Sequence, residues 1–314
     1  MASVGDSEDD RRPGAVLVVV TWNSAEVLPG LFESLELGMA GLRWRLVVAD
    51  NASADGTPDV VRAKAPDALL VETGRNAGYS AAFNAALDAV GKLDEQTDAV
   101  FVCNPDIRMR PGCGVALVMG LKAPGTGITA PLLYDGTGRM IRTLRREPNP
   151  LRLLGEMVLG ASRSGRFAAL GEQVTDPAAY RKATRADWAA GSLMAISREC
   201  LDACGPWDES FFLYSEETEF ALRAGTRGFA TRLAPDAVAV HLEGEAMVSP
   251  KLWTLLTLNR VRLYRRTHRT PAVAAFWAAL LLRESSRALL GRSASRAAVR
   301  ALVSPAKLRA KPGP

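Results

Sequence analysis

Four short runs of apolar, mostly β-branched residues near the start of the chain each stop abruptly at a polar loop. The runs are Ala15–Thr21, Arg45–Ala49, Ala68–Glu72 and Val100–Cys103. Runs of this kind predict strands that are buried on both faces of a sheet. Helical segments follow the polar loops, and this alternation predicts a doubly wound α/β fold with a mostly parallel sheet. In such folds ligands bind at the carboxyl ends of the strands.

The fourth run ends at Asn104-Pro105-Asp106. Proline removes a backbone donor and stops the strand, which leaves the Asp106 carboxylate at the end of a central strand. An ordinary Asn-Pro-Asp turn has the same composition, so this motif alone leaves a binding role and a turn both open.

The loops after the second and third runs carry further polar groups. Asp50 suits hydrogen bonding to a base or to a ribose hydroxyl, although Asp50 and Asp55 are equally suited to capping the next helix. Gly78 permits a close approach of the backbone, and Arg75 can pair with a phosphate. Either feature is also compatible with simple loop chemistry.

An acidic stretch begins a later helix. Glu216, Glu217 and Glu219 lie in its first turn after Ser215, where they complement the helix dipole. Aromatic residues come immediately before, and their apolar surface would raise the pKa of a carboxylate toward that of a usable base; these residues are Phe211, Phe212 and Tyr214. His241 ends a further strand, where an imidazole is either structural or a metal ligand.

The size and composition of the chain favour one large domain with an appendage. Its 314 residues are 48% apolar, which is enough for a full core. The four cysteines form no CxxC pair, so a reduced, cytosolic chain with inert thiols is expected. Residues 1–13 are polar and acidic, which predicts disorder and no signal peptide. No stretch reaches the roughly 18 apolar residues that cross a bilayer.

Charge is divided unevenly along the chain. Residues 251–314 carry a formal charge of +13, against −8 for the first 250 residues. Within this basic tail, Pro271–Leu282 is apolar and contains Trp277, and arginines recur after it at helical spacing. The pattern indicates an interfacial anchor on an anionic leaflet; the alternative is a helix packed on the core with a solvated basic end. Nucleic acid is not expected as a partner, because the tail lacks a reading motif.

Taken in order, these stretches resemble family 2 glycosyltransferases, particularly their rhamnosyltransferase-like branch, between about Val16 and Arg266. The matching segments are Thr21-Trp22-Asn23, residues 50–57, Asn76-Ala77-Gly78 with Asn84, Asn104-Pro105-Asp106, Gly191-Ser192, residues 207–212 with 214–217, and His241. The resemblance implies a GT-A catalytic domain over residues 14–250, with an arginine-rich insertion at 134–185 on the acceptor side. That insertion is expected to be a lid or a disordered segment. Residues 251–314 would form a basic helical extension.

The resemblance also implies roles for individual residues. Asp106 and His241 would hold Mg²⁺ or Mn²⁺, and Glu217, with Glu216 beside it, would be the catalytic base. The residues implied to bind the donor nucleotide are Thr21, Asn23, Asp50, Asn76, Gly78 and Asn104. Those implied to contact the sugar or acceptor are Trp188, Gly191, Asp208 and Glu209.

Two positions depart from the family pattern. The family has Asp where this chain has Glu217 and Glu219, and it has a serine soon after His241, where this chain has Glu243-Gly244-Glu245-Ala246. The implied activity is inverting, metal-dependent transfer of a sugar in cell-envelope polysaccharide synthesis. The expected donor is dTDP-rhamnose, the expected acceptor is polyprenyl-diphosphate-linked or a glycan, and the expected location is the inner face of the plasma membrane. The alternative is a non-catalytic, nucleotide-binding module of GT-A type that docks to a membrane or an anionic polymer.

Overall fold

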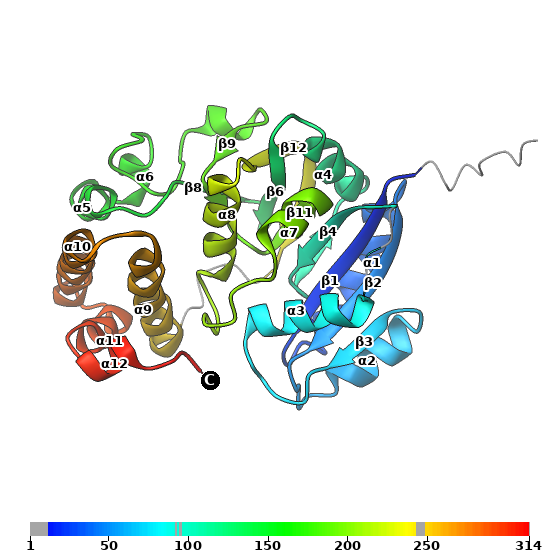
Figure 1. The fold of residues 1–314 in the computed structure, drawn as a ribbon, viewed down its shortest axis with the longest axis horizontal. Helices are drawn as coiled ribbons and strands as arrows, with labels where there is room; N and C mark the ends of the chain where they lie inside the picture. The colour runs from blue at the N-terminus through cyan, green and yellow to red at the C-terminus, as the bar shows by residue number, and fades with distance from the viewer. Residues whose placement is uncertain (1–11, 92, 94–95, 243–248, 314) are drawn as a thin grey trace, which may run out of the picture.

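The computed structural model describes residues 12–91, 93, 96–242 and 249–313. Its centre is a ten-stranded, mixed and mostly parallel sheet of the predicted doubly wound type (Figure 1). The parallel half contains, in spatial order, β3 (Leu69–Glu72), β2 (Arg43–Asp50), β1 (Gly14–Thr21) and β4 (Thr97–Cys103). The order continues through β11 (Leu193–Ser197), β6 (Thr126–Asp135), β12 (Ala230–His241) and β5 (Ile107–Met109).

Helices cover both faces of the sheet because the strands are apolar on both sides. Along β1, Leu17 and Val19 pack into one core cluster, and Val16 and Val18 pack into the other. The first cluster includes residues of α1 (Leu28–Gly38), α2 (Thr57–Lys64) and α4 (Cys113–Leu121). The second includes residues of α3 (Tyr79–Val90), α7 (Arg198–Cys204) and α8 (Glu216–Thr226).

The insertion at 134–185 is ordered, so the disordered alternative is wrong. It contains β7 (Met140–Ile141), β8 (Leu144–Arg145), α5 (Pro150–Leu159), α6 (Ala161–Ser164), a 3₁₀ turn (Pro177–Tyr180) and β9 (Arg185–Ala186). β8 pairs with β10 (Trp188–Ala189), and β9 pairs with β12. Its side chains form a small core with Leu233 of the main sheet. Three of its arginines, Arg145, Arg146 and Arg152, donate to carbonyl groups of the insertion itself.

The strand that His241 ends is β12, and it changes register between Ala234 and Val238. The predicted disorder of residues 1–13 concerns a segment that, apart from residues 12 and 13, lies outside the described residues, as does the segment Glu243–Ala246.

The C-terminal extension folds into four helices. These are α9 (Pro250–Thr267), α10 (Thr270–Leu289), α11 (Ser293–Leu302) and α12 (Pro305–Arg309). α10 packs against α5 of the insertion as well as against α9 and α11 (Figure 1). Phe276 and Leu280 of α10 are fully buried, and the Trp277 indole donates to the Leu302 carbonyl at 3.0 Å. The buried part of Pro271–Leu282 therefore belongs to the core of a helical bundle, as in the alternative of a packed helix, and these buried side chains do not face a bilayer.

Buried ion pairs join the insertion to the extension. Arg260 of α9 pairs with Glu172, and Arg283 of α10 pairs with Glu156 at 3.3 Å. Glu284 of α10 has a fully buried side chain and accepts a hydrogen bond from the Trp253 indole at 2.8 Å. The two segments therefore form one composite unit on the sheet, although the sequence suggested two independent parts. Among the described residues, no helix has both the length and the apolarity that spanning a bilayer requires.

Replacing Arg260 by glutamine is expected to lower the free energy of unfolding by about 3 kcal/mol, because the Glu172 carboxylate would remain buried without its partner. The matched control is Arg62→Gln, which breaks the Arg62–Glu72 pair, whose side chains are both 53% exposed. That change is expected to cost less than about 1 kcal/mol. Urea denaturation of the two variants checks the difference, and equal losses would show that the buried pair does not hold the composite unit in place.

Candidate active site

A cavity of about 690 Å³ opens at the carboxyl ends of β1 and β4. Loops from the sheet form one side, and residues from the beginning of α9 form another. Of the predicted site residues, its lining contains Thr21, Asn23, Asn76, Gly78, Asn104 and Asp106. The ends of adjacent strands thus bring together residues that are distant in the sequence, as expected for an α/β sheet.

Asp106 lies in the short turn between β4 and β5. Antiparallel pairing of β5 with β12 sets His241 opposite Ile107, and the Leu242 amide donates to the Asp106 carbonyl at 3.1 Å. The His241 Nε2 is 3.0 Å from the Asp106 Oδ2, and both side chains are largely buried. The Asp106 Oδ1 is buried and has no hydrogen-bond partner among the described residues. A buried carboxylate oxygen without a partner is costly unless a ligand satisfies it.

These two side chains fit a divalent cation that is shared with a phosphate-bearing ligand. One carboxylate and one imidazole supply an oxygen and a nitrogen donor, which Mn²⁺ and Mg²⁺ both accept. No group of three or more His, Cys, Asp or Glu side chains with metal-binding spacing occurs within the described part of the chain. A cation here would therefore take its remaining ligands from bound substrate and water, the usual arrangement for Mg²⁺ at phosphates.

Glu217 is the second residue of α8 and is not among the residues that line the cavity. It packs against Gly191, where an added Cβ would come within 3.1 Å of the Glu217 Cβ. The neighbouring Ser192 carbonyl accepts a hydrogen bond from the Asn104 amide at 2.8 Å, two residues before Asp106. Tyr79 connects the same groups, because its hydroxyl donates to the Asn104 Oδ1 at 3.2 Å. Its pKa is raised by burial and further by the negative charges of Glu216, Glu217 and Asp106. Glu217 and Asp106 are thus on the same side of the sheet, around one tyrosine.

The turn before Glu217 has an unusual backbone. Tyr214 and Ser215 both have positive φ angles, of 69° and 77°, which non-glycine residues rarely adopt. Ser215 is the N-cap residue of α8 but makes no capping hydrogen bond with its side chain. The turn is held by Asn259 of α9, a fully buried residue whose amide donates to the carbonyls of Leu213 and Tyr214 at 2.9 and 3.0 Å. A side chain of the extension therefore fixes the start of the helix that carries the two glutamates.

Glu216, the second predicted catalytic residue, is buried behind this turn. It is 4% exposed, and its Oε2 has no hydrogen-bond partner among the residues that the structure describes. Burial raises the pKa of Glu216 well above the ordinary value of 4.5, and the charge of Glu217 raises it further. Ionisation of Glu216 therefore destabilises the folded state.

Glu216→Gln is expected to become more stable than the wild type as the pH rises. The pKa of Glu216 is higher in the folded state than in the unfolded state. The carboxyl therefore makes its full contribution to the free energy of unfolding below its ordinary pKa, and that contribution is lost as the pH rises through the raised value. Glutamine has no proton to lose, so the melting temperature of the variant should rise relative to that of the wild type between about pH 5 and about pH 9. Thermal unfolding across this range checks the prediction, and parallel curves for the two proteins would contradict it.

Asp50 and Gly78 both make structural contacts within the chain, and of the two only Gly78 lines the cavity. Asp50 is buried, and its carboxylate accepts hydrogen bonds from Thr21 (2.8 Å) and from the amide and hydroxyl of Ser53. It therefore organises the loop and does not line the cavity. Gly78 has a φ of +97°, and a Cβ there would lie 2.3 Å from the Phe212 carbonyl oxygen. The backbone that approaches Gly78 closely is therefore that of Phe212. Gly78 also borders the cavity.

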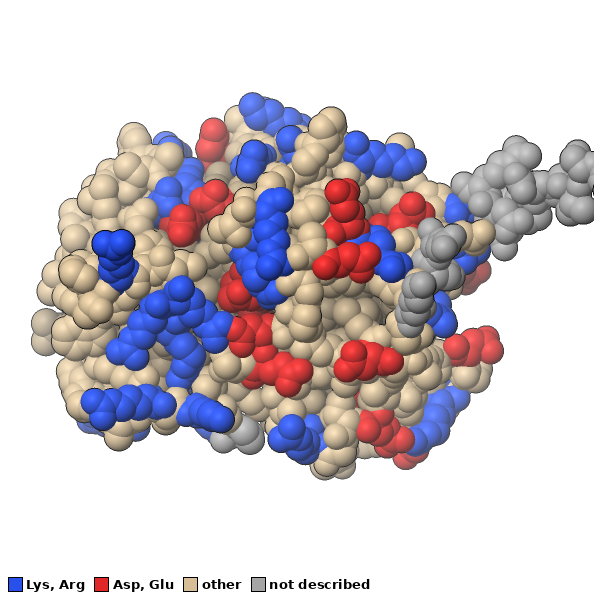
Figure 2. All heavy atoms as spheres, in the orientation of Figure 1, with Lys and Arg blue, Asp and Glu red and all other residues tan. Residues whose placement is uncertain are grey.

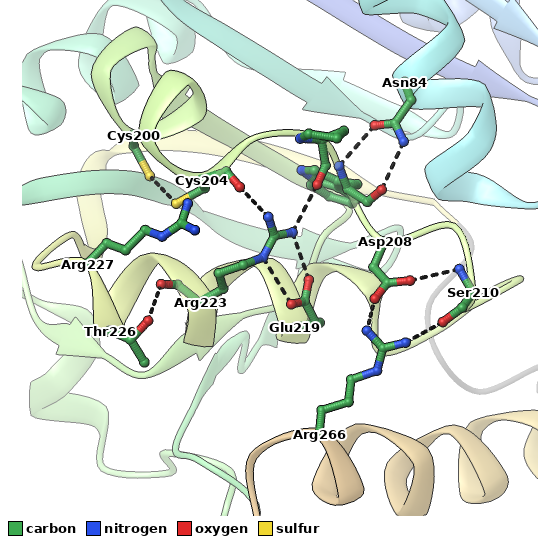
Figure 3. A network of polar contacts seen from close by, with 12 residues as sticks. Asn84, Cys200, Cys204, Asp208, Ser210, Glu219, Arg223, Thr226, Arg227 and Arg266 are labelled. Carbon is green, nitrogen blue, oxygen red and sulfur yellow. Dashed lines mark hydrogen bonds and ion pairs between the residues drawn. The ribbon is translucent and has the colours of Figure 1, made fainter.

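Three of the residues expected at the sugar or acceptor are engaged elsewhere. Asp208 pairs with Arg266 of α9 and accepts from the Ser210 amide (Figure 3), and Glu209 accepts from Asn84 at 2.9 Å. The Trp188 indole donates to the Arg146 carbonyl at 3.1 Å. None of these three side chains lines the cavity. Asp208 and Glu209 therefore connect the loop before α8 to the extension and to α3, and their assignment to the acceptor stays a prediction.

Asn51, Trp22 and Lys251 are among the cavity residues that were not predicted as site residues. Asn51 follows Asp50 and lines the cavity. Successive side chains along a strand point in opposite directions, so the sequence did indicate that Asp50 and Asn51 face different ways. Trp22 lines the cavity with 57% of its surface exposed. Lys251, at the beginning of α9, also lines it and forms no ion pair within the described residues. No sequence signal connected this lysine to the sheet.

The geometry agrees with the comparison with known protein families. Residues 16–167 match the glycosyl transferase family 2 model. The protein is a family 2 glycosyltransferase. This glycosyltransferase is 28% identical over 234 residues to N-acetylglucosaminyl-diphospho-decaprenol L-rhamnosyltransferase of Mycobacterium tuberculosis, over 72% of this chain and 75% of the relative. It belongs to the rhamnosyltransferase-like branch. Membership of an enzyme family argues against the alternative of a non-catalytic module.

Solved structures show the same GT-A fold. The mannosyltransferase of Pyrobaculum calidifontis, in complex with GDP-Man and Mn²⁺, superposes with a TM-score of 0.54 at 18% identity, covering 93% of this chain and 80% of that one. Glucosyl-3-phosphoglycerate synthase of Mycobacterium tuberculosis, in complex with Mn²⁺, UDP and glucosyl-3-phosphoglycerate, gives a TM-score of 0.50 at 20% identity. It covers 82% of this chain and 80% of its own. The GT-A fold predicted for this glycosyltransferase is confirmed.

Proposed function

We propose that this glycosyltransferase moves rhamnose from dTDP-rhamnose to a polyprenyl-diphosphate-linked or glycan acceptor, with inversion and with the help of Mg²⁺ or Mn²⁺. The observation that carries the proposal is the Asp106 Oδ1, which is buried at the cavity beside His241 and has no hydrogen-bond partner among the described residues. Asp106 and His241 would hold the cation. When bound, the cation stabilises the negative charge that develops on the leaving nucleoside diphosphate.

The remaining steps are assigned to residues of the chain. Glu217 accepts the proton of the acceptor hydroxyl while the oxygen of that hydroxyl bonds to the anomeric carbon. The bond from that carbon to the diphosphate oxygen breaks on the opposite face, so the configuration inverts and no covalent enzyme intermediate forms. Gly191 leaves space for Glu217, since a Cβ there would crowd its side chain.

The cavity offers groups for each part of the donor. The exposed ring of Trp22 suits stacking on the base, and Asn23 and Asn51 offer polar groups beside it. Lys251, together with the N-terminal end of α9, suits the diphosphate. The proposed rhamnose and lipid-linked acceptor are supported by the name of the mycobacterial relative, which specifies a decaprenol diphosphate substrate. We place the enzyme on the cytoplasmic face of the plasma membrane, with its basic extension toward anionic lipid.

A thermal-shift screen of nucleotide-sugars with Mn²⁺ or Mg²⁺ tests the donor, because a ligand that binds only the folded state raises the melting temperature. dTDP-rhamnose with metal is expected to give the largest shift, and a larger shift with another donor would overturn the choice of rhamnose. Transfer to a polyprenyl-diphosphate acceptor is then measured with and without EDTA. Undiminished transfer in EDTA would overturn the metal.

A further inference from the structure

Helices α5 and α10 pack against each other (Figure 1), and the residues that meet along them show that they run in the same direction. Leu153 belongs to the cluster that contains Phe276 and Ala279. One turn further along both helices, Glu156 pairs with Arg283 at 3.3 Å. The C-terminal ends of the two helices therefore come together at one end of the composite unit, although one belongs to the insertion and the other to the extension.

Large apolar side chains are exposed at these two helix ends. Leu289 and Leu290, at the end of α10, are 90% and 82% exposed, and Val158 and Leu159, at the end of α5, are 73% and 38% exposed. Neither a turn nor a neighbouring helix of the described chain covers them. Several apolar side chains gathered at one place, with this degree of exposure, are characteristic of an interaction surface.

The charge around these side chains is positive. Arg163 follows α5 in α6, and Arg292 and Arg296 follow α10, and all three are exposed. The carboxylates of residues 148–175 and 250–313 are confined to Glu156, Glu172 and Glu284, whose side chains are 8%, 5% and 0% exposed. On the face shown in Figure 2, the lower-left part, where Figure 1 places α10–α12, carries basic and no acidic side chains. Internal pairing of these three acids therefore leaves the surface of residues 148–175 and 250–313 positive.

We propose that this docking surface, formed by Val158, Leu159, Leu289 and Leu290 with Arg163, Arg292 and Arg296, binds an anionic lipid bilayer. The four apolar side chains enter the boundary between headgroups and acyl chains, and the three guanidinium groups pair with lipid phosphates. The proposal rests on the proposed lipid-linked acceptor and names the part of the molecule that meets the lipid. It differs from the anchor expected from the sequence, because Phe276 and Leu280 are buried in the bundle.

The test is sedimentation of the full chain with vesicles of about 70% phosphatidylcholine and about 30% phosphatidylglycerol, compared with phosphatidylcholine alone. Leu289→Ser/Leu290→Ser is expected to weaken partitioning about tenfold or more, since two leucines lose their place in the apolar layer. The matched control is Leu37→Ser/Met119→Ser, which removes two exposed apolar side chains, 60% and 52% exposed, from α1 and α4. Arg292→Gln/Arg296→Gln is expected to weaken binding to the anionic vesicles only.

Each other outcome counts against the docking surface. Wild-type binding that Leu289→Ser/Leu290→Ser leaves unchanged would show that another surface meets the lipid. A wild-type dimer that becomes monomeric in this variant, seen by sedimentation velocity, would make a second copy of the chain the partner. Absence of wild-type binding to either vesicle would overturn the proposal outright. Cleavage of the nucleotide-sugar in detergent solution is measured in parallel, so that failure of the docking surface is distinguished from failure of the proposed function.

Discussion

Asp106→Asn is expected to lower kcat by about a thousandfold, the largest effect of any single substitution in the cavity. The asparagine keeps the size of the side chain but removes the negative charge beside His241. The buried Oδ1 would also no longer offer a carboxylate oxygen to a cation. The diphosphate would then leave without the charge compensation on which the proposed mechanism depends.

The measurement compares kcat for sugar transfer at saturating donor, together with the affinity for Mn²⁺ in the presence of the nucleoside diphosphate. Both should fall in Asp106→Asn. Asp67→Asn, at an exposed loop position, is the control and should retain the wild-type rate and metal affinity. If the variant has a reduced kcat but binds Mn²⁺ with the wild-type affinity, Asp106 is not a ligand of the metal.

Glu217→Gln is expected to lower kcat by about 10² to 10⁴, because glutamine cannot accept the proton of the attacking hydroxyl. Glu217 lies against Gly191 at the start of α8 and outside the lining of the donor cavity. The donor dissociation constant should therefore change by less than about twofold, so that the loss is confined to the chemical step.

Glu217→Asp serves as the conservative variant for the same position. It restores the shorter side chain that the family uses and should retain much more activity than Glu217→Gln. The acidic limb of the pH–rate profile should be present in the wild type and in Glu217→Asp, and absent from the residual activity of Glu217→Gln. If all three profiles share the same acidic limb, the base is another residue.

The sheet and the placement of Asp106 and His241 beside each other were predictable because both follow from local patterns. Each buried strand is a continuous apolar run with a polar residue at its end, and Asp106 and His241 each lie at such an end. The direction of an individual side chain was harder to predict. Asp50 and Asn51 are adjacent at the end of β2, yet only Asn51 lines the cavity, and a shift of one residue decides which side chain faces the ligand.

The composite unit was not predictable from local pattern. The Arg260–Glu172 pair joins residues 88 positions apart, and the pairing of α5 with α10 joins an insertion to the end of the chain. The stretch Pro271–Leu282 has the same apolar composition whether it meets lipid or other helices, so composition could not separate an anchor from a bundle core. The partner that decides the outcome is α5, which is more than a hundred residues away.

The contact between Asn259 and the turn at Tyr214 has a practical consequence for work with fragments of this enzyme. A chain cut after residue 250 would contain the whole sheet, every strand-end residue of the cavity and both glutamates. It would nevertheless lack the amide that holds two unfavourable backbone angles immediately before those glutamates. In such a fragment Glu217, the proposed catalytic base, would no longer be held within reach of the sugar. The loss of activity would then be mistaken for evidence that the enzyme needs a membrane.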